Sequence, residues 1–300
     1  MSSVHETHSV RAPDGRTLTL SEGGDPDGVP VLVHVGTPSG CLPYQPHLED
    51  AARRGIRLIA YDRPGYGGST RKAGRNVADC TADVVAICDA LGIERFCAWG
   101  VSGGGPHVLA TAAFLAERCV AVASLASIAP IDAEGLDFTA GMGKSNVESF
   151  EAVLAGEETH RARHEQDLQD LLGTTPERLV EVWGSLLGPA DREVATGEVA
   201  TFLLDNATAA VTPSSAGWFD DDIAFSKPWG FEVSSIQVPV LLMHGEQDLF
   251  VPYGHGLWLA EHIPEVDARL SAEDGHLTLP ERRIGEVHAW LVERFVAGGP

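Results

Sequence analysis

Short apolar runs alternate with longer segments of helical periodicity along the first 130 residues of the chain. The apolar runs predict buried strands, and the longer segments predict helices between them. Predicted strands lie at residues 31–35, 56–61, 95–99 and 120–128, and predicted helices at 47–54, 77–91 and 106–117. Two earlier strands, at 7–11 and 17–21, flank the turn residues Pro13, Asp14 and Gly15 and predict a hairpin. This alternation predicts an α/β fold with a mostly parallel, twisted sheet and helices on both faces.

The alternation stops at Pro130, and no clear strand follows until Val238. Predicted helices fill the interval at 146–155, 157–172, 176–187 and 198–210, and strands resume at 238–244 and 268–271. Because the interruption falls between two strands of one sheet, it predicts a helical cap over the strand ends. The predicted organisation is a core of residues 1–130 and 236–300 with a cap insertion at 131–235.

Ser102 lies at the centre of a G-x-S-x-G pattern, between a predicted strand and a predicted helix. Such a turn holds the serine in a sparsely populated backbone conformation, which Gly100 and Gly103 permit because neither carries a side chain. Gly104 allows the following helix to pack closely on the strand. A strand, a tight glycine turn and a helix are the setting of a nucleophile, so Ser102 is the candidate catalytic serine.

A serine hydroxyl is a weak nucleophile and needs a base within hydrogen-bond reach, oriented by a third group. Asp248 follows the strand at 238–244, and His276 lies in a Gly-His loop after the strand at 268–271. Both are therefore expected where parallel strands end, with His276 as the base and Asp248 as the acid. Asp132 is an alternative acid from an earlier strand, and Asp274 is interpreted as a solvated turn residue.

An acyl-transfer site also needs donors for the oxyanion that develops on the substrate. One expected donor is the backbone N–H of Gly103, the residue after the candidate nucleophile. The second is expected from the loop after the strand at 31–35, where Gly36 permits a sharp turn and Thr37 precedes Pro38. Thr37 and Gly103 are therefore the candidate oxyanion hole, although an ordinary glycine loop gives the same pattern.

These motifs together resemble the α/β-hydrolase group that contains haloperoxidase-like esterases, lactonases, carbon-carbon bond hydrolases and proline iminopeptidases. The matching segments are the loop at 36–38, the stretch from Asp62 to Ser69, the turn at Ser102, and the loops of Asp248 and His276. The resemblance implies a Ser-His-Asp triad, an acyl-enzyme mechanism and a helical cap, without a cofactor or a metal. Relatives with an aspartate nucleophile are disfavoured because position 102 is a serine.

Composition narrows the range of partners. A net charge of −22 argues against nucleic acid and anionic membrane surfaces, since both are bound through clusters of Lys and Arg. No apolar run is as long as a membrane span, and the first residues lack the pattern of a signal peptide, so a cytoplasmic protein is expected. Five cysteines without a C-x-x-C pair predict free thiols. The expected partner is a small-molecule substrate, and whether the chain forms a homo-oligomer stays open.

Two features of the cap segment have competing interpretations. His160 and His164 have a metal-compatible spacing, but without an evident third ligand an exposed helix face is preferred. The run Asp220, Asp221 and Asp222 is interpreted as a solvated edge or as a site for a cationic substrate group. Three functions therefore stay open: hydrolysis of a small or medium carboxylic ester or lactone, which leads; an iminopeptidase or related amidase; and a non-catalytic binding protein.

Overall fold

An eight-stranded sheet forms the centre of the structure, a computed structural model in which residues 6–299 are described. The strands are β1 (Glu6–Arg11), β2 (Thr17–Gly24), β3 (Val29–His34), β4 (Ile56–Tyr61), β5 (Phe96–Val101), β6 (Cys119–Leu125), β7 (Val240–Gly245) and β8 (Val266–Ser271). Their order across the sheet is β1-β2-β4-β3-β5-β6-β7-β8. β1 and β2 form an antiparallel hairpin and β2 pairs antiparallel with β4, whereas all the later pairings are parallel. The predicted mostly parallel α/β sheet is confirmed.

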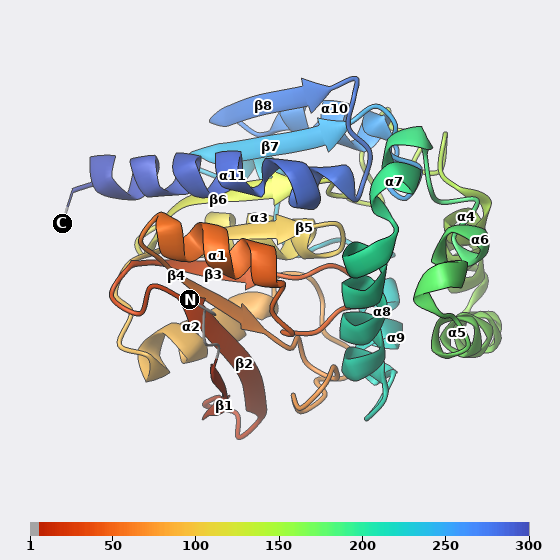
Figure 1. The fold of residues 1–300 in the computed structure, drawn as a ribbon, viewed down its shortest axis with the longest axis horizontal. Coiled ribbons are helices and arrows are strands. Elements are labelled where there is room, and N and C mark those ends of the chain that lie inside the picture. Colours follow the sequence, from red (N-terminus) through yellow and green to blue (C-terminus); the bar gives the residue numbers. More distant parts are fainter. Residues whose placement is uncertain (1–5, 300) are drawn as a thin grey trace.

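Helices cover both faces of this sheet. They are α1 (Gln45–Arg53), α2 (Cys80–Ala90), α3 (Gly104–Phe114), α10 (Tyr253–His262) and α11 (Thr278–Ala297). α1 and α11 lie on the face turned toward the viewer in Figure 1, and α2, α3 and α10 lie behind it. Alternate residues of β3 point to opposite faces, so Val31 and Val33 pack with α1 and α11, and Leu32 packs with α2 and α3. Two apolar cores therefore enclose the sheet.

The segment between β6 and β7 forms a group of helices that we call the β6–β7 insertion. Its elements are α4 (Lys144–Ala155), α5 (Glu157–Leu172), a 3₁₀ turn (Pro176–Arg178), α6 (Leu179–Val182), α7 (Pro189–Val194), α8 (Gly197–Val211), α9 (Ala216–Phe225) and a second 3₁₀ turn (Val233–Ser235). The arrows of β5 and β7 point toward these helices in Figure 1. A third apolar core joins Leu171, Leu179 and Leu204 of the insertion to Tyr66 and Leu277 of the sheet loops. The insertion thus packs directly against the ends of the parallel strands.

The predicted elements differ from the observed ones in several places. The segment at 176–187 is not one helix, since it contains only the 3₁₀ turn and the four-residue α6. The short α7 and the helix α9 were not predicted, because they lie in segments without a helical pattern. β6 ends at Leu125 rather than at residue 128, because Ala126 has a positive φ of 48° and leaves the strand. None of these differences alters the order of the sheet.

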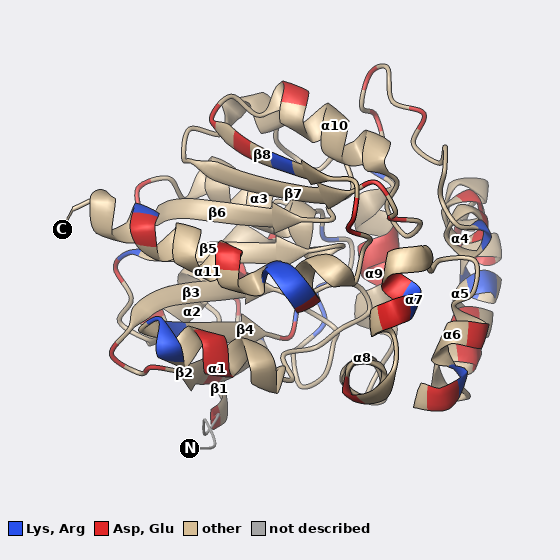
Figure 2. Ribbon diagram, turned by 45° about the horizontal axis from the view of Figure 1, so that its top comes forward, with Lys and Arg blue, Asp and Glu red and all other residues tan. Residues whose placement is uncertain are grey.

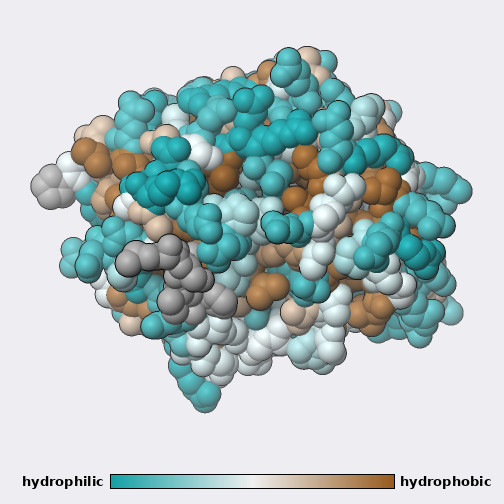
Figure 3. Space-filling model, in the orientation of Figure 1, coloured by the Kyte–Doolittle hydropathy of each residue, from teal (hydrophilic) through white to brown (hydrophobic). Residues whose placement is uncertain are grey.

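The chain carries an excess of acidic residues, with 43 Asp and Glu against 21 Lys and Arg. Red segments of the ribbon mark acidic residues in α6 and α7 in Figure 2, in keeping with the net charge of −22. On the face shown in Figure 3, brown residues form small groups among hydrophilic ones, and the larger ones lie on the side that carries the β6–β7 insertion. Within residues 6–299, no helix combines the length and apolar character needed to cross a membrane.

Candidate active site

The turn after β5 holds Ser102 in a left-handed conformation, with a φ of 55°. Such a φ is uncommon for a residue other than glycine and persists only where surrounding contacts fix it. Here the amide of Ser102 donates to the carbonyl of Leu125 at 2.9 Å, and the carbonyl of Ser102 accepts from the amide of Gly105 at 2.8 Å. The predicted strand, turn and helix are therefore present, and the turn is anchored on both sides.

Small residues around this turn are required by close approach. A Cβ on Gly103 would overlap the hydroxyl of Thr37, and a Cβ on Gly104 would overlap the carbonyl of His34. On the other side, a Cβ on Gly36 would lie 3.5 Å from the Cβ of Ser102. The structure thus brings the loop after β3 against the turn after β5. The two candidate oxyanion donors, Thr37 and Gly103, are neighbours beside Ser102.

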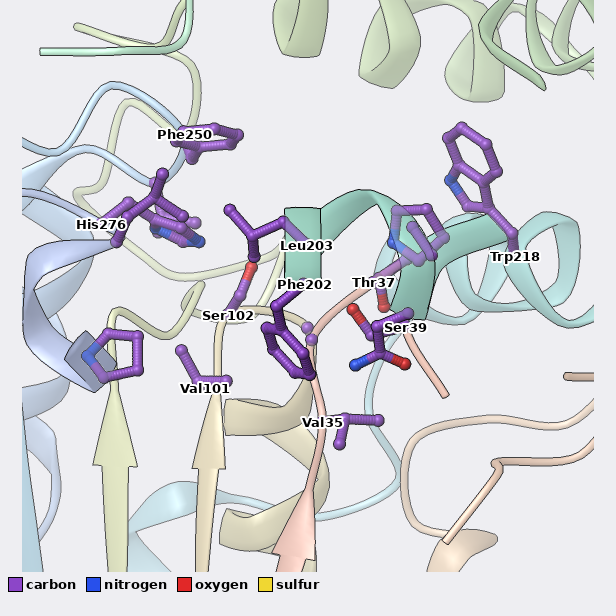
Figure 4. A pocket seen from close by; sticks show the side chains of 18 of the residues that line it. Val35, Thr37, Ser39, Val101, Ser102, Phe202, Leu203, Trp218, Phe250 and His276 are labelled. Carbon is purple, nitrogen blue, oxygen red and sulfur yellow. The ribbon is translucent and has the colours of Figure 1, made fainter. Parts of the chain in front are cut away.

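His276 and Asp248 form a buried hydrogen-bonded pair. The Nδ1 atom of His276 lies 2.7 Å from Oδ2 of Asp248, and both side chains are almost fully buried. Burial alone would lower the pKa of His276, but the Asp248 carboxylate raises it above its ordinary value of 6.5. Because Nδ1 is occupied, Nε2 is the nitrogen left for the cavity, and the ring points toward Ser102 in Figure 4. Phe250 stacks on the ring, with centroids 4.6 Å apart.

The other oxygen of Asp248 fixes the direction of this carboxylate. Oδ1 accepts from the amides of Phe250 and Val251 at 2.9 and 2.8 Å. His244, at the end of β7, lies on the remaining side, with Nε2 3.6 Å from Oδ2 of Asp248 and 2.8 Å from the carbonyl of Val251. Asp248 is therefore oriented by its own loop. The alternative acid, Asp132, is exposed, whereas Asp248 pairs with the His276 ring.

A second carboxylate holds the backbone of the His276 loop. Asp191 on α7 is completely buried and accepts from the amides of His276, Leu277 and Thr278 at 2.8, 2.8 and 3.2 Å. These amides lie at the start of α11, where unpaired N–H groups and the helix dipole favour a negative charge. Burial raises the pKa of Asp191, while the His276 ring and the amides of His276 and Leu277 oppose this effect. Sequence reasoning missed Asp191, because one aspartate in an acidic segment carries no distinguishing pattern.

Arg63 connects the candidate oxyanion loop to the β6–β7 insertion. Its guanidinium donates to the carbonyls of Val35 and Gly36 and, at 2.8 Å, to the hydroxyl of Thr37. The same group pairs with Asp221 of α9 at 2.6 Å, and the Thr37 hydroxyl donates to that carboxylate at 2.8 Å. Arg63 therefore fixes the loop through its carbonyls and its side chain together. The resemblance included the stretch from 62 to 69 but did not assign Arg63 a task.

Two members of the acidic run on α9 differ from both interpretations made from the sequence. Asp220 is buried and pairs with Arg71, and Asp221 is fully buried between Arg63 and Arg75. Burial alone would raise the pKa of Asp221, but the two guanidinium groups hold it far below its ordinary value. These two carboxylates are thus neither a solvated edge nor available to a substrate. The interpretation of Asp274 as a solvated turn residue is also wrong, since it is buried and pairs with Arg283.

Asp222, the third member of the run, lies beside the two histidines of α5. Both histidines are more than nine-tenths buried, so the interpretation as an exposed helix face is wrong. His160 Nε2 lies 3.0 Å from Oδ2 of Asp222, and His164 Nδ1 lies 3.9 Å from the same oxygen. The third residue that sequence reasoning did not find comes from α9, 58 positions after His164.

A cavity of about 400 Å³ unites most of the candidate residues. Thr37, Ser102, Gly103 and His276 line it, and Asp248 lies behind His276. The β6–β7 insertion contributes mainly apolar walls, with Trp183, Leu186, Phe202, Leu203 and Trp218. Figure 4 shows Trp218 at the end of the labelled group opposite His276, with Ser102 between them. A volume of this size suits a small organic molecule.

The five cysteines do not form disulfide bonds. All five are buried and free, as the odd count predicted. Cys41 lies nearest in the sequence to the candidate loop, and its amide donates to Asp62 at 2.7 Å. Burial raises the pKa of the Cys41 thiol well above its ordinary value, which keeps it protonated at neutral pH.

The parallel sheet, the positive-φ serine after β5 and the His276 loop after β8 define the α/β hydrolase class. The chain belongs to the α/β hydrolase fold family, whose sequence profile matches residues 29–282. It is similar to the non-heme chloroperoxidase of Streptomyces lividans, with 28% identity over 82% of this chain and 83% of the relative. It is also similar to the bifunctional esterase/perhydrolase DCH of Acinetobacter calcoaceticus, with 24% identity over 81% of this chain and 83% of the relative.

A solved structure supports the same assignment of the fold. The α/β hydrolase fold protein from Nakamurella multipartita superimposes with a TM-score of 0.65 and 27% identity, over 98% of this chain and 100% of that one. The fold predicted from the sequence is confirmed by these similarities and by the sheet order. Taken together, the family and its relatives make this chain a hydrolase.

Proposed function

We propose that this protein is a serine hydrolase that cleaves small or medium carboxylic esters or lactones through an acyl-enzyme. The observation that carries the proposal is the pairing of His276 with Asp248 at 2.7 Å, at the wall of the cavity that Ser102 also lines. A base oriented by a buried carboxylate beside a strained serine is the arrangement that activates a hydroxyl. The relative named an esterase/perhydrolase supports the same chemistry.

The first step of the proposed mechanism forms the acyl-enzyme. Ser102 Oγ attacks the substrate carbonyl while His276 Nε2 accepts the hydroxyl proton, and Asp248 stabilises the imidazolium that results. The backbone N–H groups of Thr37 and Gly103 donate to the oxyanion of the tetrahedral intermediate. His276 then gives the proton to the leaving alcohol. A water molecule, activated by His276, releases the acid and restores Ser102.

The cavity favours an acyl group or alcohol with apolar character. Its walls around Ser102 include Leu203, Phe202 and Phe225, which offer apolar contact rather than charge. An iminopeptidase would need a carboxylate for the substrate ammonium group. Asp220 and Asp221 are already paired with arginines, and Asp222, which lines the cavity, lies beside His160 and His164. The ester or lactone assignment is preferred over the amidase because the walls around Ser102 are mainly apolar. The β6–β7 insertion acts in this proposal as the cap that closes the cavity.

Parallel turnover assays test the proposal. The wild-type protein and Ser102→Ala are compared on p-nitrophenyl acetate, p-nitrophenyl octanoate and prolyl-p-nitroanilide. Ester hydrolysis that is lost in Ser102→Ala supports the proposal, and a longer acyl chain is expected to be accepted because the walls are apolar. Anilide turnover in place of ester turnover would support the iminopeptidase, and wild-type rates in Ser102→Ala would overturn the mechanism.

A further inference from the structure

A second polar cluster lies in the β6–β7 insertion, apart from the candidate triad. His160 and His164 lie one turn apart on α5, and Asp222 faces them from α9. One side-chain ligand atom from each of the three residues lies within 4.8 Å of the others. Residues from two separate helices therefore bring two imidazoles and one carboxylate to a single point.

His164 is the member of this cluster that lacks a partner. The residue is 7% exposed, and neither ring nitrogen makes a hydrogen bond to any part of the chain that the structure describes. An unpaired buried polar group costs about 1–3 kcal/mol, so buried imidazoles normally have partners. The closest acidic oxygen, on Asp222, lies 3.9 Å from Nδ1, which is beyond hydrogen-bond distance. A metal ion that accepted a lone pair from a ring nitrogen of His164 would give this imidazole the partner it lacks.

We propose that His160, His164 and Asp222 bind a divalent first-row transition ion, with Zn²⁺ as the best-fitting class. Tetrahedral Zn²⁺ bonds of about 2.0–2.1 Å place neighbouring ligand atoms about 3.3 Å apart. The observed separations of 3.0 and 3.9 Å from Asp222 lie on either side of this value. Small side-chain rotations would therefore complete the set, and two imidazoles with one carboxylate suit a borderline ion of this kind.

The charges around the cluster leave Asp222 available for this ion. Its neighbours Asp220 and Asp221 are paired with arginines, whereas the Asp222 carboxylate lies beside the two histidines. Within residues 6–299, no guanidinium forms an ion pair with this carboxylate, so its negative charge is left for a cation. A cation between the three residues would be held by that charge and by two neutral imidazoles.

Aromatic rings hold the two imidazoles in place. Phe219 stacks on His160 with centroids 4.1 Å apart and planes 13° apart, and the rings of Trp218 and His164 form a T-shaped pair with centroids 5.0 Å apart. Rings fixed in this way lose little freedom when an ion binds, which favours affinity.

Three protein ligands leave one tetrahedral position for water or another group. Asp222 and Trp218 line the cavity that holds Ser102, while the histidines lie behind them. The fourth position of the ion is therefore expected to face this cavity, at the end away from His276. A polar group of a bound molecule would be able to occupy it.

Metal titration of the full-length protein tests this site. After treatment with a chelator, the protein is titrated with Co²⁺, followed by visible absorption, and with Zn²⁺, followed by calorimetry. We expect saturable binding of a single ion per chain, with weakening by about tenfold or more in His160→Ala, His164→Ala and Asp222→Asn. His262→Ala, which removes an exposed histidine of α10, is the matched control and should leave the affinity unchanged. Ser102→Ala should also bind the ion normally.

Each outcome decides the proposal. Absence of saturable binding to the wild-type protein overturns it, and so does equal weakening in His262→Ala and His164→Ala. Because the substitutions at His160, His164 and Asp222 change buried contacts of α5, circular dichroism is used to check that these variants are folded. The shifts of the imidazole resonances of the wild-type protein during Zn²⁺ titration give an independent measurement. If those shifts spare His160 and His164, the ion binds elsewhere and the assignment is wrong.

Discussion

Individual residues around Ser102 leave little room for change. The positive φ of Ser102 places its hydroxyl at the cavity. The loop of Thr37 approaches so closely that Gly103 has space only for a hydrogen atom and not for a side chain. The Thr37 hydroxyl is in turn held by Arg63 and Asp221. A change of one methyl group at Gly103 would therefore move the backbone that carries the proposed oxyanion donors.

We predict that Gly103→Ala lowers kcat by about a hundredfold to a thousandfold, the loss typical of one oxyanion donor. The added Cβ would overlap the Thr37 hydroxyl and lie 3.1 Å from Phe225. Steady-state kinetics on a p-nitrophenyl ester measures the effect. The matched control is Gly254→Ala on α10, where the nearest atom, in Leu136, is 3.4 Å away. Control kinetics as slow as those of Gly103→Ala would contradict the explanation.

The charge of Asp248 sets the expected pH dependence of the reaction. His276 must be neutral to accept a proton, so activity rises with pH through its pKa, which Asp248 raises above 6.5. Asp248→Asn removes that cause, and we expect the acidic limb of kcat/KM to move to lower pH. The same change is expected to lower kcat by about 10⁴-fold, because the imidazole loses its orientation. A midpoint that stays at the wild-type pH in the variant would refute the role of Asp248.

At the scale of elements, the contact between α7 and α11 positions the base. Asp191 lies on α7, a helix of only six residues, and its carboxylate caps the start of α11 through three amides. The loop that presents His276 is thus fixed from the β6–β7 insertion as well as from Asp248. The packing of the β6–β7 insertion and the position of His276 are therefore expected to depend on each other.

We predict that Asp191→Ala lowers the free energy of unfolding by about 3 kcal/mol, since it leaves buried amides without an acceptor. It should also reduce kcat, because the His276 backbone loses its anchor. Urea unfolding and ester kinetics measure the two effects. Asp89→Ala, which breaks an exposed pair with Arg118, is the control and should change both far less. Unchanged stability and unchanged kcat in Asp191→Ala would show that α7 does not position the loop.

The elements also show how far sequence patterns reach. The strands, the Ser102 turn and the pairing partners Asp248 and His276 follow from local periodicity and from their places at strand ends. Asp191 and the cluster of His160, His164 and Asp222 do not, because each depends on how separate helices of the insertion pack. Helices of the insertion carry no local indication of which faces meet, so the prediction that the α5 histidines lie on an exposed face was wrong. Only the tertiary arrangement brings α9 against α5.

On the scale of the whole molecule, one ion-pair network joins the sheet to the insertion. Arg63 follows β4 and Arg75 precedes α2, and both guanidinium groups bind the Asp221 carboxylate on α9. All three side chains are almost fully excluded from solvent. A charge left alone in such surroundings is costly, so the network holds core and insertion together only while every member is present.

Asp221→Asn should therefore destabilise the protein by about 3–5 kcal/mol at neutral pH, since two buried guanidinium groups lose their counter-charge. The pKa of Asp221 is depressed in the folded state, so its stabilisation is present above its ordinary pKa of 3.8 and is lost as the pH falls below that value. The difference in the free energy of unfolding between the wild type and Asp221→Asn should consequently become smaller below pH 3.8. Urea unfolding at a series of pH values measures this difference, with Asp220→Asn as the control, because its partner Arg71 is half exposed. If the difference in unfolding free energy stays constant down to acidic pH, the charge of Asp221 does not hold the core and the β6–β7 insertion together.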